Sequence, residues 1–390
     1  MIDEAGGATS AQPARARARS LDVRMNAAGP VVRYGARSLV NFCSNDYLGL
    51  AAHPAVREAA VRAVAHYGVG AGSAALLGGW TEAHREFALR IARYLRRDRA
   101  LLFSSGYLAN LGTLASFAGR HDEIFHDKLN HASLIDGVRL STARSTRYRH
   151  GDPEDLARRL AASTAAHRIV VTDGVFSMDG DCAPIAALAR LARAHDALLV
   201  CDDAHGFGVL GGGRGLLAEC GLTQDDVPLL VVTFGKALGV SGAAVVGRED
   251  LIEALLQRAR TFIYDTAMPP ALPAACSAAL DLIESDAALV ARLQANIAHF
   301  RAALLDAGLT RPASTTAIQP IVLGDDARAL AAAAALEAAG YYVRAVRPPT
   351  VPEGSSRLRV CLSAAHEPAQ IDGLVGALVE ALARLPAVSA

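Results

Sequence analysis

Short apolar runs alternate with longer amphipathic stretches through the middle of the chain. Several runs are apolar on both faces, as strands are when helices cover both sides of a sheet. The segments between them, such as 153–166 and 184–195, have helical spacing. This alternation predicts an α/β fold with a mainly parallel, doubly wound, seven-stranded sheet. The expected strands are 100–103, 123–126, 146–149, 169–175, 198–201, 229–234 and 243–247.

The pattern changes after about residue 265. Residues 271–309 form an almost continuous helical pattern, and three strand-like runs follow at 318–323, 342–346 and 357–362. Helices with a few separate strands predict a smaller C-terminal α+β domain. We therefore expect three parts: an N-terminal arm at 1–45 that packs on the small domain, a large α/β domain at 46–265 and the small domain at 266–390.

Composition excludes several classes of protein. The chain has 390 residues with 39 basic and 39 acidic side chains, and this balance argues against a nucleic-acid binder. Its six cysteines are scattered without metal-ligand spacing, which predicts neither a disulfide framework nor a metal site. The first residues lack the apolar stretch of a secretory signal, and no apolar run has the length of a spanning helix. We expect a soluble, cytoplasmic protein.

Lysine is rare in this chain. Of the 39 basic residues only Lys128 and Lys236 are lysines, so 37 are arginines. Lys236 follows the expected strand 229–234, between Gly235 and Gly239, where burial would lower its pKa and make the neutral amine available for a Schiff base. Lys128 lies in a polar segment, and we expect it to be an ordinary loop charge.

Asp202 and His205 follow another expected strand, 198–201. A buried carboxylate there needs a cationic partner, and a pyridinium nitrogen is one that fits. The alternative is that Asp202 caps the next helix. Because Lys236 follows a buried strand in the same way, we favour a cofactor site at this edge of the sheet.

Three further segments carry possible ligand contacts. Gly106 and Tyr107 stand between a strand and a helix, where backbone N–H groups form a phosphate seat. His131 is either a partner that stacks on a ring or a core imidazole, and Ser177 either binds a ligand or begins a turn. The glycine runs at 68–72 and 211–215 do not join a buried strand to a helix, which argues against a nicotinamide site.

Longer strings resemble a known family. Residues 41–50, 173–181, 202–206 and 232–236 are similar to the α-oxoamine synthases, which are fold-type-I pyridoxal phosphate (PLP) enzymes, and the similarity runs from Asn41 through nearly the whole chain. The strings that resemble one subfamily more than its relatives are 241–245, 317–321 and 347–352. That subfamily condenses L-alanine with a pimeloyl thioester, with loss of carbon dioxide and the free thiol, in biotin biosynthesis.

The resemblance implies a role for each matching residue. Lys236 would carry PLP as a Schiff base and, with His131, move protons, while Thr266 would reach the phosphate of a neighbouring subunit in a homodimer with shared active sites. The implied cofactor contacts are Lys236, Asp202, His205, His131, Ser177, Gly106, Tyr107, Thr233 and Thr266. The implied substrate contacts are Arg347, which would hold the amino-acid carboxylate, and Thr350, Arg19 and Asn45.

Three positions depart from the family pattern, and some questions stay open. Asp265 stands beside the expected phosphate seat, where a carboxylate would repel phosphate unless it is turned away. Asp173 replaces a longer Glu, and segment 70–79 keeps only part of a glycine pattern. The acyl carrier, coenzyme A or acyl carrier protein, is open. A sister synthase that uses glycine and a catalytically inactive protein on the same fold are the alternatives.

Overall fold

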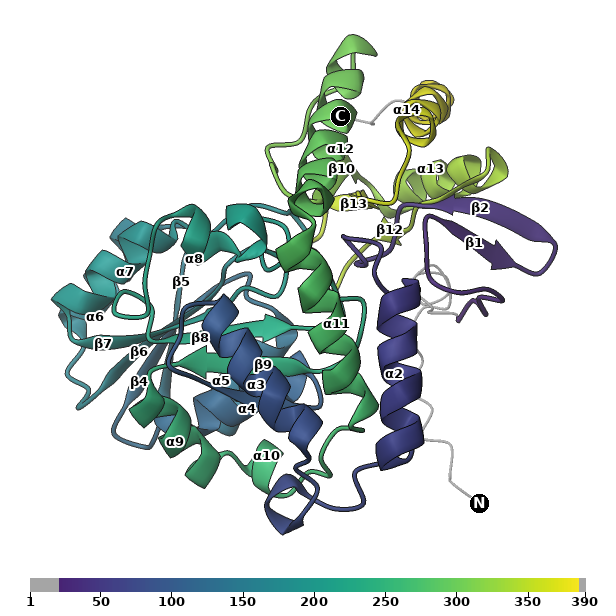
Figure 1. Ribbon diagram of the computed structural model, residues 1–390. Coiled ribbons are helices and arrows are strands. Elements are labelled where there is room, and N and C mark those ends of the chain that lie inside the picture. The colour runs from purple at the N-terminus through teal and green to yellow at the C-terminus, as the bar shows by residue number, and fades with distance from the viewer. Residues whose placement is uncertain (1–20, 386–390) are drawn as a thin grey trace, which may run out of the picture.

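The computed structural model describes residues 21–385. Its centre is a seven-stranded sheet in the order β3-β9-β8-β7-β6-β4-β5 (Figure 1). All neighbouring strands pair in parallel except β9, which runs antiparallel to both β3 and β8. The strands are β3 (Arg99–Phe103), β4 (Glu123–Asp127), β5 (Arg144–Tyr148), β6 (Arg168–Asp173), β7 (Ala197–Asp202), β8 (Leu229–Thr233) and β9 (Ala243–Gly247). The predicted fold class is confirmed.

Helices cover both faces of this sheet because successive side chains of a strand point to opposite sides. Val170 and Val171, neighbours in β6, lie in two different hydrophobic cores. One core packs the sheet against α3 (Glu82–Tyr94), α6 (Pro153–Ala162) and α7 (Ile185–Ala194). The other packs it against α4 (Gly106–Phe117), α5 (Ala132–Leu140), α9 (Glu249–Arg258) and α10 (Arg260–Ile263).

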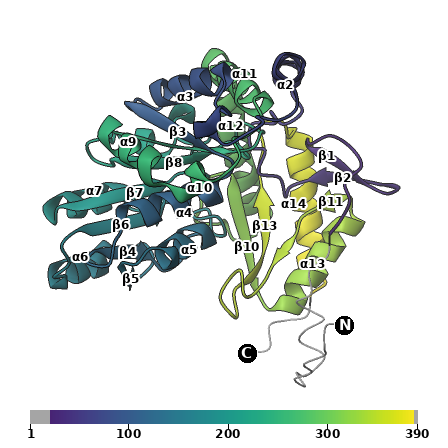
Figure 2. The same ribbon diagram turned by 90° about the horizontal axis from the view of Figure 1, so that it is seen from below.

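The C-terminal part forms a smaller α+β unit. An antiparallel sheet in the order β10-β13-β12 is joined by three helices (Figure 2). Its elements are β10 (Ile318–Gly324), β12 (Ala345–Val346), β13 (Ser356–Cys361), α12 (Ala287–Asp306), α13 (Asp326–Ala338) and α14 (Pro368–Ala383).

Two expected elements in this region are divided. The helical pattern at 271–309 forms α11 (Ala271–Ser285) and α12, because the carboxylate of Asp286 caps the second helix by accepting a hydrogen bond from Ala288 N. The expected strand 342–346 forms β11 (Tyr341–Tyr342) and β12, which belong to different sheets. The helical pattern at 271–309 thus corresponds to two consecutive helices, and the expectation of one strand at 342–346 was wrong.

The N-terminal part of the described chain is a hairpin of β1 (Val31–Tyr34) and β2 (Arg37–Asn41). β2 pairs in parallel with β11, so this hairpin lies against the small C-terminal unit. Helix α2 (Pro54–Tyr67) then packs beside α11 (Figure 1). The short elements that complete the fold are η1 (Ala75–Leu77), η2 (Gly211–Gly213) and α8 (Leu216–Glu219).

The parallel strands end in polar residues at one edge of the large sheet. β4 ends at Asp127, β6 at Asp173, β7 at Asp202 and β8 at Thr233. The carboxyl ends of parallel strands are where α/β proteins bind ligands. Across residues 21–385, the helices are too short or too polar to cross a membrane.

Candidate active site

A cavity of about 430 Å³ opens at the carboxyl ends of the parallel strands. The structure brings most of the residues that the sequence singled out into this one cavity. Those that line it are Asn45, Gly106, Tyr107, His131, Ser177, Asp202, His205, Thr233 and Lys236. Among the described residues, no cluster of His, Cys, Asp and Glu side chains has the arrangement of a metal site.

Other expected site residues lie elsewhere. In the described part of the chain, Thr266, Arg347 and Thr350 do not line this cavity. Thr266 forms a β-bridge with Ala74, and Thr350 N donates to Arg347 O at 3.0 Å in a turn. Arg19 lies outside the described residues.

Lys236 enters the cavity from the turn that follows β8. Its Nζ donates to Thr233 Oγ1 at 2.9 Å. Gly239, at φ +66°, closes the turn, and a Cβ there would lie 2.3 Å from Ala51 N, so this position needs glycine. Burial lowers the pKa of Lys236, although the charge of Asp202 acts in the opposite direction. The amine is therefore easier to deprotonate than that of an exposed lysine.

Asp202 lines the cavity and is 5 % exposed. One carboxylate oxygen accepts from Ala204 N at 3.0 Å, and the other accepts from Asn110 Nδ2 at 2.6 Å. Asn110 Nδ2 also lies 2.9 Å from Ser133 Oγ. These contacts fix the carboxylate while leaving it able to accept a further hydrogen bond from a ligand in the cavity.

His205 follows Asp202 on the loop after β7 and is 8 % exposed. Its Nδ1 lies 2.7 Å from the hydroxyl oxygen of Tyr47, a residue of the segment between β2 and α2. Burial lowers the pKa of His205 well below its ordinary value, and the nearby charge of Lys236 acts in the same direction. The imidazole is therefore neutral at physiological pH.

His131 lines the cavity and caps α5. Its backbone N donates to Asp173 Oδ2 at 2.6 Å, and its ring Nδ1 lies 2.7 Å from Ser133 Oγ. Burial raises the pKa of Asp173 well above the ordinary value, and the charge of Asp202 adds to this effect. The shorter side chain of Asp173 thus reaches the backbone that carries His131.

The first turn of α4 is the place where the phosphate seat is expected. Ser105 caps the helix by accepting a hydrogen bond from Leu108 N at 3.2 Å. The N–H groups of Gly106 and Tyr107 have no acceptor within the helix, as at any helix start. A Cβ at Gly106 would lie 2.5 Å from Thr233 Cγ2, so only glycine lets β8 approach this closely.

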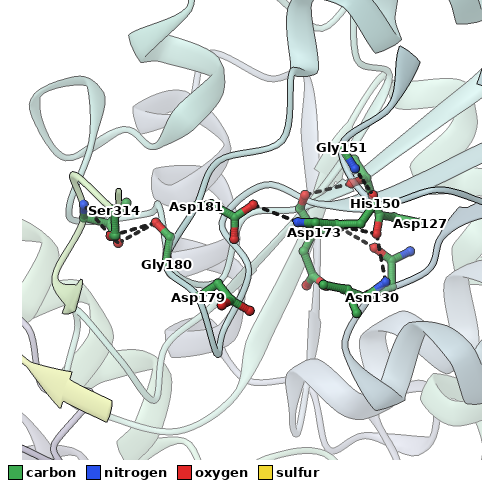
Figure 3. A network of polar contacts seen from close by, with 12 residues as sticks. Asp127, Asn130, His150, Gly151, Asp173, Asp179, Gly180, Asp181 and Ser314 are labelled. Atoms are coloured by element: carbon green, nitrogen blue, oxygen red, sulfur yellow. Dashed lines mark hydrogen bonds and ion pairs between the residues drawn. The ribbon is translucent and has the colours of Figure 1, made fainter. Parts of the chain in front are cut away.

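His150 links the end of β4 to the loop 174–182 (Figure 3). Its Nδ1 lies 2.9 Å from Asp127 Oδ1, and its Nε2 lies 2.9 Å from Asp181 Oδ2. The ring also meets Phe176 edge to face, with centroids 4.4 Å apart. Phe176 precedes Ser177, so His150 holds the loop that carries this cavity residue.

The same loop contacts the small unit. Gly180 O accepts hydrogen bonds from Ser314 Oγ at 2.9 Å and from Thr316 Oγ1 at 3.0 Å (Figure 3). Asp179 forms an ion pair with Arg357 of β13. The loop 174–182 is therefore held by residues from both parts of the chain.

Among the lining residues that sequence reasoning missed are Arg359 and Asn110. Arg359 lies in β13 and donates through Nη1 to Asn45 Oδ1 at 3.2 Å and through Nε to Ser177 O at 2.6 Å. A charged residue in an otherwise buried strand, and a lone amide in the apolar helix α4, were the signals that could have identified them.

These residues fit PLP. Lys236 supplies an amine, Asp202 a fixed carboxylate for a protonated ring nitrogen, and Gly106 a close approach at a helix start for the phosphate. Asn110 Oδ1 is buried and has no hydrogen-bond partner in the described structure, as expected of a site that is completed by a ligand.

Comparisons with known proteins identify the family of the chain. A family model described as aminotransferase class I and II matches residues 37–378. The chain is 53% identical over 367 residues to the 8-amino-7-oxononanoate synthase of Marinobacter nauticus, covering 92% of this chain and 93% of that protein. It is 54% identical over 347 residues to the synthase of the same name from Alkalilimnicola ehrlichii, covering 89% of each.

Solved structures show the same architecture. Serine palmitoyltransferase of Sphingomonas wittichii superposes with a TM-score of 0.87 and 32% identity, covering 90% of this chain and 89% of that one. The 8-amino-7-oxononanoate synthase of Francisella tularensis superposes with a TM-score of 0.76 and 30% identity, covering 88% of this chain and 97% of that one.

Proposed function

The chain belongs to the 8-amino-7-oxononanoate synthase family of PLP enzymes, and we propose from this premise that its cavity condenses L-alanine with a pimeloyl thioester. The products are 8-amino-7-oxononanoate, carbon dioxide and the free thiol, as in biotin biosynthesis. One observation supports this proposal most strongly: Lys236, Asp202 and His205 line the same cavity at the strand ends.

PLP supplies an electron sink for negative charge on the α-carbon of the amino acid. Asp202 would keep the ring nitrogen protonated, and the start of α4 at Gly106 and Tyr107, with Thr233, would hold the phosphate. His205 and Ser177 would contact the phenolic oxygen, and His131 would pack on the ring. Two observations support these proposed roles: the residues line the cavity, and the chain belongs to a family of PLP enzymes.

Lys236 is the residue that moves the reacting proton. Its Nζ takes the proton from the α-carbon of alanine and later returns one to the same carbon after carbon dioxide has left. Burial lowers the pKa of this amine, which favours the neutral form that a base requires. His131 also lines the cavity, and its backbone N donates a hydrogen bond to Asp173. Its ring is the second proton donor in this proposal.

Two arginines are candidates for holding carboxylates. Arg359 lines the cavity beside Asn45, which makes it the guanidinium placed to hold the carboxylate of alanine. Arg347 stays a prediction for the same carboxylate, and Thr350 and Arg19 stay predictions for the acyl substrate. Coenzyme A and acyl carrier protein are both retained as carriers of the acyl group.

We also propose a homodimer in the cytoplasm, with Thr266 of one subunit completing the phosphate seat of the other. Large apolar side chains near Thr266 are strongly exposed, among them Leu77 at 80% and Tyr264 at 70%. An apolar cavity of about 480 Å³ beside β3 includes Trp80 and Phe262 in its walls. A second copy of the chain that covers this face would bury these groups.

A substrate screen tests the proposed function. Protein loaded with PLP is incubated with alanine, glycine or serine, each paired with the pimeloyl thioester of coenzyme A or of acyl carrier protein. We expect 8-amino-7-oxononanoate and carbon dioxide from alanine alone. Turnover of glycine or serine in its place would favour a sister synthase, and absence of product with every pair would favour an inactive protein.

A further inference from the structure

The hydroxyl group of Tyr47 lies between two possible acceptors beside the cavity, and it also has a side-chain hydrogen bond with the guanidinium of Arg359. Its ring is fully buried, at 0% exposure. The hydroxyl oxygen lies 2.7 Å from His205 Nδ1 and 3.3 Å from Asn45 Oδ1. Because a phenol carries one proton, it donates to only one of these two atoms at a time.

Geometry and competition favour His205 as the acceptor. A separation of 2.7 Å is typical of a well-formed hydrogen bond from a hydroxyl group, whereas 3.3 Å is long for one. Asn45 Oδ1 also accepts from Arg359 Nη1 at 3.2 Å, so a charged donor already serves it. The proton of Tyr47 therefore points to His205 Nδ1.

The protonation of His205 then follows. Its burial and the charges of Lys236, Arg359 and His131 lower its pKa, so the ring is neutral and carries a single N–H. With Nδ1 occupied as an acceptor, the proton lies on Nε2. His205 lines the cavity in which the cofactor is proposed to bind.

We propose that Tyr47 is a positioning residue that fixes His205 in its Nε2–H form, so that the imidazole presents an N–H donor to the cavity. The protonation form itself is a property of the protein alone. Its consequence rests on the proposed function: an N–H donor stabilises an oxygen that carries negative charge, such as the phenolic oxygen of PLP. The reverse form would present a lone pair there and repel that oxygen.

The protonation form is measured directly by ¹⁵N NMR on the cofactor-free full chain with ¹⁵N-labelled histidine, with His205→Asn to assign the signals. Protonated and unprotonated imidazole nitrogens have well-separated chemical shifts. We expect Nε2 of His205 to carry the proton, and Nδ1 to lose its hydrogen-bond shift in Tyr47→Phe. A proton on Nδ1 in the unaltered protein would overturn the proposal, whether or not the variant folds.

A matched control separates this role from general packing. The hydroxyl group of Tyr94 is buried and has no hydrogen-bond partner within the described residues. The Tyr94 ring packs edge to face on Phe207, with ring centroids 6.2 Å apart. Tyr94→Phe removes the same atom and should leave the His205 spectrum unchanged.

A second readout uses the loaded enzyme. Tyr47→Phe should weaken PLP binding and lower kcat, each by up to about tenfold, since a hydrogen bond that supports a charged group contributes about that factor. Tyr94→Phe should change neither quantity by more than about twofold. Equal effects of the two variants, or an unchanged Nδ1 signal in Tyr47→Phe, would contradict the positioning role. If the chain does not use alanine, the NMR result still decides the protonation form.

Discussion

The hydroxyl group of Ser104 donates a hydrogen bond to the carboxylate of Asp265 at 2.5 Å. Ser104 stands just before Ser105, the cap of α4, whose first turn is the proposed phosphate seat. This contact gives the carboxylate of Asp265 a partner other than a phosphate group. The acidic residue that departs from the family pattern is thereby accommodated.

Loss of this partner should weaken binding of the cofactor. In Ser104→Ala, the freed carboxylate would repel the phosphate, and we expect the Kd for PLP to rise roughly fivefold, the effect of about 1 kcal/mol from one screened charge. The fluorescence of Trp80, the one tryptophan of the chain, reports binding because this residue lines a small cavity with Ser104 and Asp265. Ser104→Ala combined with Asp265→Asn should restore the affinity, and a double variant as weak as the single one would contradict this explanation.

His150 should make stability depend on pH. Burial lowers its pKa, but the hydrogen bonds to Asp127 and Asp181 outweigh burial and raise the pKa from the ordinary 6.5 to about 10. Since the folded state has the raised pKa, the stabilisation is fully present below pH 6.5 and is lost as the pH rises through about 10. The difference in unfolding free energy between the unaltered protein and His150→Gln, measured in urea, should shrink over this range.

A surface pair provides the control for His150. His299 Nε2 lies 2.7 Å from Asp372 Oδ1, and both side chains are exposed to solvent. Solvent screens such pairs, so His299→Gln should change the unfolding free energy by less than about 1 kcal/mol at every pH. A difference for His150→Gln that is constant from pH 6.5 to 10 would show that its imidazole is neutral in the folded protein.

Substitutions of Arg359 and of Arg347 should change the KM for L-alanine to different extents. Lysine cannot form the bidentate contact of a guanidinium, so Arg359→Lys should raise the KM for L-alanine by about tenfold or more. Arg347→Lys should affect this KM less, because Arg347 does not line the described cavity. Steady-state kinetics with alanine varied at saturating thioester measures both, and the reverse order would assign the alanine carboxylate to Arg347.

The sheet was predictable because strands buried on both faces leave continuous apolar runs. Each of the seven expected runs is a strand: β9 has the expected bounds, and the others, such as β7, differ from them by a few residues at most. The division of 342–346 between two sheets was not predictable, because pairing of Tyr341–Tyr342 with β2 joins residues about 300 positions apart in sequence. Such pairing depends on packing that a local pattern does not contain.

The site was predictable where a residue directly ends a strand. Asp202 and Thr233 are of this kind, and Lys236 follows three residues after the end of β8. Arg359 and Asn110 reach the cavity because β13 and α4 pack against the strand ends, and that packing is tertiary. Thr266 lies outside the cavity of its own chain, so its expected role requires a second subunit.

The central claim is that Lys236 holds the cofactor, and the presence of only two lysines makes a direct test possible. The PLP-loaded protein is reduced with borohydride, cleaved at arginines and analysed by peptide mass spectrometry. We expect a phosphopyridoxyl group on the peptide that contains Lys236 and none on the peptide that contains Lys128. Modification of Lys128 in its place, or of neither lysine, would contradict it.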